Sequence, residues 1–467
     1  MRSHPLFLAF AFVVSTVAHG ADVFRSADPF NTDAIAPPRP LLSPVADSAY
    51  APCRELPAGA IYSVLEVVDL ALCQNPKTRE SWANARSQAA LVGVAQSNFL
   101  PGLDGKLGVS RTNTDTQNIN QSNVSLTLSW LIYDFGARSA NLENARQLLS
   151  AASSTLDATV QTVFLTALQS YYNAQAARAA VSAALESEKA SRESFTAAEV
   201  RYKVGTGTPA DRLQAQTAWS QATLNRIKAE GTLKTTYGTL ANVMGLDASQ
   251  PLTLAEISEA TPDASFERDI EALITEARDR RPDLKAAEAQ VKAAQSNIDF
   301  TRASGLPTLS LGAGPGWVDS GNISSHSSSI GLTLTVPIFS GFDTTYKVRS
   351  AQAKAEAASA QRDNIRLQVA LDVWTAYQNL TTATQTIRTT ADLLANAEQS
   401  ERVALGRYKA GVGIILDVLN AQSALAAARV QRIQAMLDWN VSRASLAKAV
   451  GTLDSRLLNP AAESKTP

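Results

Sequence analysis

The stretch RYKVGTG at residues 201–207 returns 206 residues later as RYKAGVG at residues 407–413. The same offset holds upstream, where Leu-Pro at residues 100–101 corresponds to Leu-Pro at residues 306–307. A fixed offset indicates that one structural unit was duplicated, and two long units are too few for a solenoid. The sequence therefore predicts one body made of two similar halves.

The duplication and the composition divide the 467 residues into six segments. Arg2, a short apolar run and the small residues before the end of the first segment are typical of a signal peptide. Proline and small polar residues are typical of an extended arm. The predicted segments are a signal peptide (1–20), an N-terminal arm (21–60), a first repeat (61–245), a linker (246–265), a second repeat (266–451) and a C-terminal tail (452–467).

Composition excludes several classes of function. The chain has 42 Lys and Arg against 43 Asp and Glu, so no polybasic surface indicates nucleic-acid binding. We find no His/Cys cluster for a metal and no phosphate-binding loop, so we expect no metal, no cofactor and no enzyme. A Ser-His-Asp site would have to use His326, which lies in a predicted turn. No apolar run after the signal peptide is long enough to predict a transmembrane helix.

Each half predicts the same order of elements: a helix, two strands, a very long helix and a further helix. The first helix is divided by a proline, and the long helix contains none. For the first half the predicted ranges are 63–98, divided at Pro76, then 102–111, 122–133, 137–203 and 209–243. For the second half they are 267–304, divided at Pro282, then 308–318, 328–339, 343–409 and 415–450.

The second predicted strand of each half alternates between apolar and polar residues. Leu126 and Leu128 alternate with Ser125 and Thr127, which predicts one apolar and one polar face. A length of about ten residues suits a tilted strand that crosses a bilayer, although a half-buried hairpin on a soluble domain has the same pattern. Four strands cannot close a barrel, whereas three copies would supply twelve. Aromatic residues at the strand ends are typical of a membrane interface: Tyr133, Phe135, Trp317, Phe339 and Phe342.

From about residue 60 to 451 the chain resembles the TolC family of outer-membrane channel proteins. The resemblance lies in Asn75-Pro76, in RPDLKAAE at 281–288, in the two Leu-Pro pairs and in the paired Arg-Tyr-Lys turns with the Asp that follows each. It implies a mainly α protomer with a β part, in a homotrimer whose 12-stranded outer-membrane β-barrel continues into a periplasmic α-helical barrel. It also implies contact with outer-membrane lipids, a periplasmic adaptor protein, and an inner-membrane ABC exporter or other pump.

The two helix reversals carry the candidate site. Asp211 and Asp417 each follow a turn, where a carboxylate either caps the next helix or, in a trimer, contributes to an acidic ring. The resemblance implies that Asp417 lines a closed periplasmic entrance and that Asp211 and Tyr408 belong to the contacts that close it. Asn420 stands where some members carry a second acidic ring, and a basic latch residue can occur at position 413, so we expect weaker closure and weaker cation preference. The turn glycines are Gly205, Gly207, Gly411 and Gly413.

Cys53 and Cys73 are the only cysteines of the chain. Export permits a disulfide between them, which would join the arm to the first helix, and two unpaired thiols are the alternative. Residues 49–52 do not form a lipid-attachment motif before Cys53. Many efflux channels of this family carry a lipidated cysteine, so the sequence favours protein secretion.

The sequence thus predicts the outer-membrane exit duct of an export machine that reaches into the periplasm. The first hypothesis is type I secretion of a protein, with a toxin as one candidate cargo, and the second is multidrug efflux. A soluble exported coiled-coil scaffold is the alternative from another class. Fractionation with outer membranes would separate the scaffold from the other two.

Overall fold

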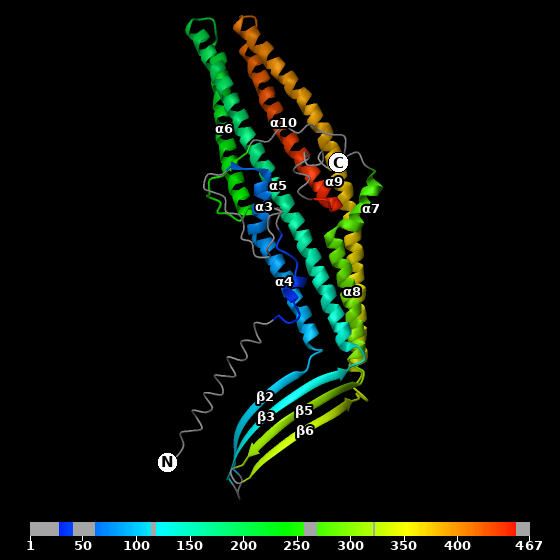
Figure 1. Ribbon diagram of the computed structural model, residues 1–467. Helices are drawn as coiled ribbons and strands as arrows, with labels where there is room; N and C mark the ends of the chain where they lie inside the picture. Colours follow the sequence, from blue (N-terminus) through cyan, green and yellow to red (C-terminus); the bar gives the residue numbers. More distant parts are fainter. Residues whose placement is uncertain (1–27, 41–60, 114–117, 256–268, 321–322, 454–467) are drawn as a thin grey trace, which may run out of the picture. The chain divides into compact units, whose positions relative to one another are not determined.

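The computed structural model describes most of the chain, in two compact units (Figure 1). The described residues are 28–40, 61–113, 118–255, 269–320 and 323–453. One unit contains residues 83–153 and 288–360, and the other contains residues 38–82, 154–287 and 361–467. The predicted signal peptide and most of the predicted arm and tail lie outside the described residues.

A four-stranded antiparallel sheet belongs to the first unit. It is built from two hairpins, one from each half, which pair through β3 and β5 to give the order β2-β3-β5-β6 (Figure 1). The strands are β2 (Gly102–Asn113), β3 (Asn118–Tyr133), β5 (Thr308–Asp319) and β6 (Ser324–Thr335). The predicted hairpins are confirmed, and the turn-proximal ends of β3 and β6 extend four residues further than predicted.

The far end of β6 was predicted wrongly. The sequence predicts a strand to residue 339, whereas β6 ends at Thr335. Pro337 lies two residues beyond this end, and a proline has no N–H group to donate to a neighbouring strand. Val336 and Ile338 therefore continue the apolar pattern in the sequence without belonging to the sheet.

The register places most apolar residues of the four strands on one face, although Leu131 and Val318 lie on the other. Leu128 pairs with Leu103 of β2 and with Ala313 of β5, and Ile330 of β6 also pairs with Ala313. Ile330 is 80% exposed, so the described chain leaves much of this face uncovered. The polar residues share the other face, which confirms the predicted alternation.

The helices follow the predicted order in both halves. In the first half they are α3 (Val64–Gln74), α4 (Pro76–Ser97), α5 (Ala137–Lys203) and α6 (Pro209–Val243). In the second half they are α7 (Ile270–Arg280), α8 (Pro282–Ala303), α9 (Asp343–Lys409) and α10 (Ile415–Val450). The breaks at Pro76 and Pro282 are confirmed, because the residue before each proline is extended. No helix among the described residues has the length and apolar character needed to cross a bilayer.

The core of the second unit contains a short sheet that the sequence analysis missed. β1 (Ile61–Tyr62) pairs in parallel with β4 (Thr253–Leu254), which lies in the predicted linker. Leu254 is 3% exposed, and Gln175 of α5 donates to the carbonyl oxygen of Ala255 at 2.6 Å. The described part of the predicted linker, residues 246–255, therefore contributes to the core. The predicted arm also contains a helix of four residues, α2 (Thr32–Ile35).

Cys73 lies in this core on α3, is 2% exposed and takes part in a disulfide. Cys53 lies outside the described residues. The pairing of Cys53 with Cys73 stays a prediction, which peptide mapping under non-reducing conditions would test.

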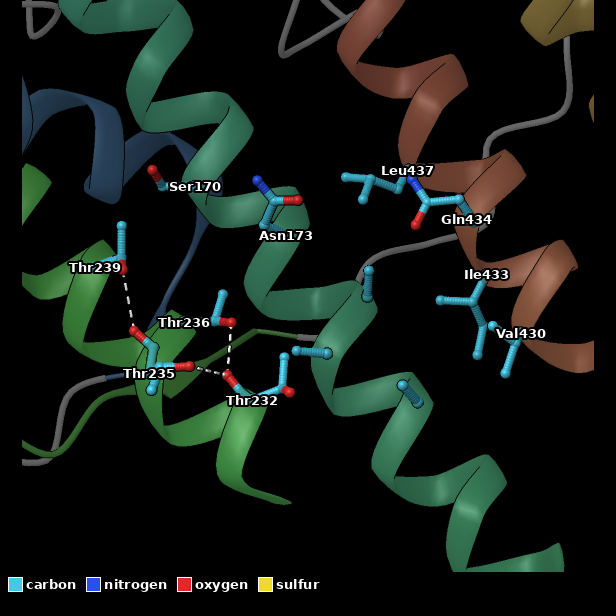
Figure 2. A pocket seen from close by; sticks show the side chains of 13 residues that line it. Ser170, Asn173, Thr232, Thr235, Thr236, Thr239, Val430, Ile433, Gln434 and Leu437 are labelled. Atoms are coloured by element: carbon cyan, nitrogen blue, oxygen red, sulfur yellow. Dashed lines mark hydrogen bonds between the residues drawn. The ribbon is translucent and has the colours of Figure 1, made fainter. Parts of the chain in front are cut away.

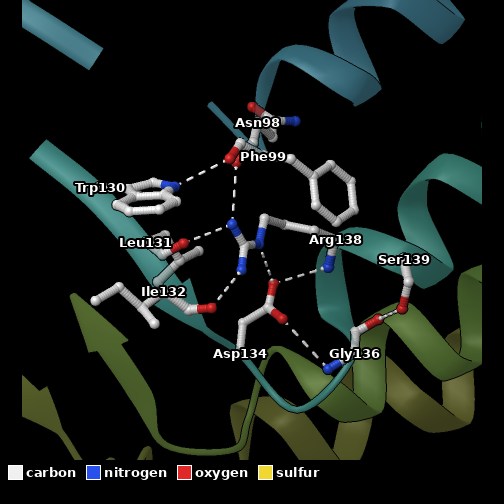
Figure 3. Close-up of polar contacts among 9 residues, drawn as sticks. All are labelled: Asn98, Phe99, Trp130, Leu131, Ile132, Asp134, Gly136, Arg138 and Ser139. Carbon is white, nitrogen blue, oxygen red and sulfur yellow. Dashed lines mark hydrogen bonds and ion pairs between the residues drawn. The ribbon is translucent and has the colours of Figure 1, made fainter. Parts of the chain in front are cut away.

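A buried ion pair fixes the junction between β3 and α5 (Figure 3). Arg138 at the start of α5 lies 3.0 Å from the carboxylate of Asp134, which is 6% exposed. The same guanidinium donates to the carbonyl oxygens of Asn98, Leu131 and Ile132, and Asp134 also accepts from the backbone N–H groups of residues 136 and 138. The junction is thus held by one arginine that satisfies carbonyl groups from two segments.

The corresponding junction between β6 and α9 lacks this ion pair. At the offset of 206 residues, Ser340 replaces Asp134 and Thr344 replaces Arg138. Gly305 lies so close to Thr344 that a Cβ atom on it would be 2.5 Å from the Thr344 Cγ2 atom. The second junction therefore depends on close van der Waals packing.

Candidate functional site

The two helix reversals have nearly the same backbone geometry. Gly205 has φ +79° and Gly411 has φ +81°, in the left-handed region that favours glycine. Gly207 and Gly413 serve another purpose, because a Cβ atom on either would lie 3.1 Å from the Cβ atom of Arg201 or Arg407 respectively. In each turn the carbonyl oxygen of the arginine in the preceding helix accepts hydrogen bonds. The backbone N–H groups of residues 206 and 207 donate to Arg201, and that of residue 412 donates to Arg407, at 2.9–3.0 Å. All four predicted turn glycines are thus explained by the backbone.

The two aspartates after the turns differ in their contacts. The carboxylate of Asp211 accepts from the Thr208 N–H at 3.1 Å, and the Asp211 N–H donates to the Thr208 hydroxyl at 3.1 Å. This capping box starts α6. In the second half Ile414 occupies the cap position, so α10 starts without a side-chain cap. Asp417 is exposed and its side chain makes no hydrogen bond or ion pair with any described residue.

Asn420 lies one helical turn after Asp417 and is also exposed. Residues three apart in a helix lie on the same face, so the two side chains form a polar edge of α10. The neighbouring Ile415 and Val418 point the other way and are at most 2% exposed. Asp417 and Asn420 are therefore free to face a solvent-filled space.

Tyr408 is the buried centre of the region around the reversals. It is 5% exposed and packs with Ala198 of α5, Ala215 of α6, and Ile415 and Val418 of α10. Burial raises the pKa of its phenol; the positive charge of Arg201 acts against this shift, and the carboxylate of Asp211 adds to it. The structure thus places Tyr408 between the two helical hairpins, α5–α6 and α9–α10, and places Asp211 near it.

Arg201 is the contact that sequence reasoning missed. Its guanidinium lies 4.2 Å from the centre of the Tyr408 ring, and its Nη2 atom donates to the Tyr408 carbonyl oxygen. The signal in the sequence was the repeated Arg-Tyr pair. That signal could not identify the contact, because both halves carry the pair and it does not say which arginine meets which tyrosine.

A cleft of about 420 Å³ lies between α5, α6 and α10, away from the reversals (Figure 2). One wall carries the hydroxyl groups of Thr232, Thr235, Thr236 and Thr239. Each donates to a carbonyl oxygen three or four residues earlier in α6, at 2.7–3.0 Å. The hydroxyl hydrogens of these threonines therefore already donate to backbone carbonyl groups of α6. Among the described residues no group of three or more His, Cys, Asp or Glu side chains could hold a metal ion.

Comparison with known proteins identifies the family. The description "Outer membrane efflux protein" matches residues 67–246 and 273–452, one match in each half. The chain belongs to the outer membrane efflux protein family. It is 31% identical over 400 residues to Protein CyaE of Bordetella pertussis, covering 84% of each chain. It is 25% identical over 339 residues to the alkaline protease secretion protein AprF of Pseudomonas aeruginosa, covering 71% of this chain and 69% of that one.

Among solved structures, the CmeC outer membrane channel of Campylobacter jejuni superimposes with a TM-score of 0.74. The identity is 20%, and the match covers 86% of this chain and 89% of that one, so it bears on the fold alone. The predicted TolC-like, tandem-duplicated fold is confirmed. The chain is an outer-membrane channel protein that extends into the periplasm, and it serves as an exit duct and not as an enzyme.

Proposed function

We propose that three copies of this chain form the exit duct of a type I secretion machine, with a protein as cargo. The observation that carries the proposal is the exposed apolar face of the four-stranded sheet, with its uncovered edge strands β2 and β6. A bilayer tolerates neither an open sheet edge nor four strands alone, whereas three copies supply the twelve strands of a closed barrel.

The choice of a protein cargo rests on two observations. AprF, named for protease secretion, resembles this chain over most of its length. Residues 49–52 do not form a lipid-attachment motif before Cys53, whereas many efflux channels of this family carry a lipidated cysteine. Multidrug efflux remains the second candidate, because the family that matches both halves is named for efflux.

We further propose that the reversals form the periplasmic entrance, where an adaptor protein and an inner-membrane ABC exporter or other pump dock. Asp417 and Asn420 form an exposed polar edge, and three copies of Asp417 around a narrow axis would concentrate cations. Asp417→Ala is expected to lower cation selectivity in planar bilayers. The matched control is Asp211→Ala, because this carboxylate is used in capping α6; equal loss of selectivity in both would contradict the assignment.

The class of cargo is tested by deleting the gene for this chain from the bacterium that carries it. We expect a protein to disappear from the culture medium and to return when the wild-type chain is supplied. The same strains are tested for drug sensitivity. An unchanged set of secreted proteins together with increased drug sensitivity would replace the secretion proposal with efflux.

A further inference from the structure

One arginine lies on the face of the four-stranded sheet that carries most of the apolar residues. Arg111 of β2 pairs with Asn120 of β3, and Leu103 pairs with Leu128 further along the same two strands. Alternate residues of a strand point to the same face, so Arg111 shares the face of Leu103. Among the described strand residues, Arg111 is the only Lys or Arg on this face. A positive charge therefore lies on the face that is expected to meet lipid.

The side chain of Arg111 is available to a ligand. It is exposed, and it makes no hydrogen bond or ion pair with any described residue. Asn120 lies directly opposite on β3, Asn113 lies two residues further along β2, and both are exposed on the same face. We call these three residues the Arg111 patch. A guanidinium has five N–H donors, and each amide has both a donor and an acceptor, so the patch offers many hydrogen bonds to an anionic or sugar-bearing group.

The Arg111 patch lies at the outer end of the apolar band. The strand from Leu103 to Arg111 rises about 3.3 Å per residue and is tilted by about 40°, so it spans about 20 Å of bilayer. The apolar band of outer-membrane strands is about 25 Å tall. The offset of 206 residues relates Arg111 to Trp317 of β5, and tryptophan is enriched at membrane interfaces. Because β3 continues into the periplasmic helix α5 at its other end, the Arg111 patch belongs to the outer interface.

The second hairpin has different chemistry at the equivalent positions. At the offset of 206 residues, the counterparts of the Arg111 patch are Trp317, Asp319 and His326. The indole N–H of Trp317 donates to the Ser324 hydroxyl at 2.8 Å, so the polar hydrogen of this ring is already used. The negative charge of Asp319 repels an anion. An anionic ligand therefore fits the first hairpin better than the second.

The proposed trimer leaves the Arg111 patch without a charged neighbour on the adjoining strand. β2 is an edge strand, and it pairs with β6 of the neighbouring copy when the barrel closes. Within one chain Val124 pairs with Trp317. The offset of 206 residues converts this pair into Ile330 of one copy opposite Arg111 of the next. An isoleucine cannot pair with a guanidinium, so Arg111 needs a partner from outside the protein.

We propose that the Arg111 patch binds the phosphate group of a phosphorylated glycolipid in the outer leaflet of the outer membrane. An arginine can bind a phosphate through two parallel N–H bonds. The amides of Asn113 and Asn120 can both donate to and accept from the hydroxyl groups of a sugar. The proposed trimer carries three such sites, which alternate with the three Trp317 positions. The inference goes beyond the export of a cargo, and it rests on the proposed function only because the sheet must face lipid.

The test measures the binding of lipid to the purified full-length protein in an uncharged detergent, by native mass spectrometry. The probe is lipid A with two phosphate groups, compared with the same lipid after both phosphates are removed. We expect the wild type to bind the phosphorylated form more tightly. Arg111→Gln should weaken this binding about tenfold, the effect of losing one hydrogen bond between charged groups. It should leave the binding of the dephosphorylated form unchanged.

The matched control is Lys106→Gln, which removes a positive charge from the same strand. Lys106 pairs with Ser125 on the polar face, so this variant should bind lipid A as the wild type does. Arg111→Lys should keep part of the affinity, because an ammonium group keeps the charge and loses the paired N–H bonds. Heat-induced dissociation is measured for each variant to detect a loss of folding. If Arg111→Gln does not assemble, Asn120→Ala replaces it, and we expect it to weaken the binding severalfold.

The outcomes distinguish the lipid site from the function on which it rests. If Arg111→Gln binds phosphorylated lipid A as the wild type does, or if Lys106→Gln loses as much affinity, the lipid site is wrong. If phosphatidylglycerol binds equally well and depends on Arg111 in the same way, the assignment to a glycolipid is wrong. The mass of the complex also gives the number of chains. A single chain would contradict the proposed trimer, whereas three chains without a preference for the phosphorylated lipid would contradict the lipid site alone.

Discussion

The two strand-to-helix junctions share a turn with two consecutive positive φ angles, at residues 135–136 and 341–342, and they are held in different ways. After β3, the buried Asp134–Arg138 pair ties three carbonyl groups to the start of α5. After β6, Ser340 and Thr344 occupy the same positions, and Thr344 packs on Gly305. The helix reversals differ in the same manner, because Arg201 contacts Tyr408, whereas the side chain of Arg407 makes no hydrogen bond or ion pair with a described residue. At these places the two halves therefore share a turn of similar backbone, while the polar contacts described here occur in the first half.

The largest difference between the halves is expected at the junctions. Arg138→Ala leaves Asp134 buried and without its ion-pair partner, which should lower the free energy of unfolding by about 3–5 kcal/mol. Thr344→Ala, at the equivalent position, should cost about 1 kcal/mol or less. Heat-induced loss of the folded form in detergent measures both, and equal shifts would mean that the ion pair does not hold the first junction.

We expect the lipid-facing strand residues of the two halves to respond in the same way to a charged substitution. Leu128→Arg in β3 and Leu334→Arg in β6 place a charge on the apolar face, at a cost of about 2–4 kcal/mol near the bilayer midplane. Thr127→Arg and Thr333→Arg change the polar face and should be milder. Membrane insertion and assembly are compared for the four variants. If both faces respond equally, the assignment of the apolar face to lipid is wrong.

Substitution of the turn glycines tests whether the backbone conformation of the two reversals contributes equally to stability. Gly205→Ala and Gly411→Ala each force a residue with a Cβ atom into the left-handed region, which costs about 1–2 kcal/mol. We expect the same loss of unfolding free energy in both, because the φ values nearly coincide. A clearly larger loss in one half would mean that contacts of the side chains, and not φ, decide the cost there.

The smallest expected effect concerns the caps. Asp211→Ala removes half of the capping box of α6 and should cost about 1 kcal/mol. Asp417→Ala removes no hydrogen bond between described residues, so the unfolding free energy should change by less than about 0.5 kcal/mol. Thermal unfolding of the two variants gives the comparison. A larger loss for Asp417→Ala would show that Asp417 stabilises the start of α10.

Sequence alone placed α5, α6, α9 and α10 at their observed limits, because prolines, turn glycines and the 206-residue offset mark every boundary. Helix limits depend on residues that are close in the chain. The alternation of apolar and polar residues in β3 is also local, so it could be predicted without knowing the strand register. The end of β6 was missed although Pro337 is visible, because the apolar pattern continues past it.

Only the tertiary structure decided which polar groups meet. Asp134 and Arg138 are four residues apart, yet their partner carbonyl at Asn98 lies 40 residues away. Arg201 and Tyr408 are separated by 207 residues, and each has an identical copy in the other half. A local sequence pattern cannot tell which arginine contacts which tyrosine when both halves carry the same pair. Burial and the distance between the hairpins decide this. The sequence thus determined the elements and their duplication, and the packing of one hairpin on the other determined that Arg201 contacts Tyr408.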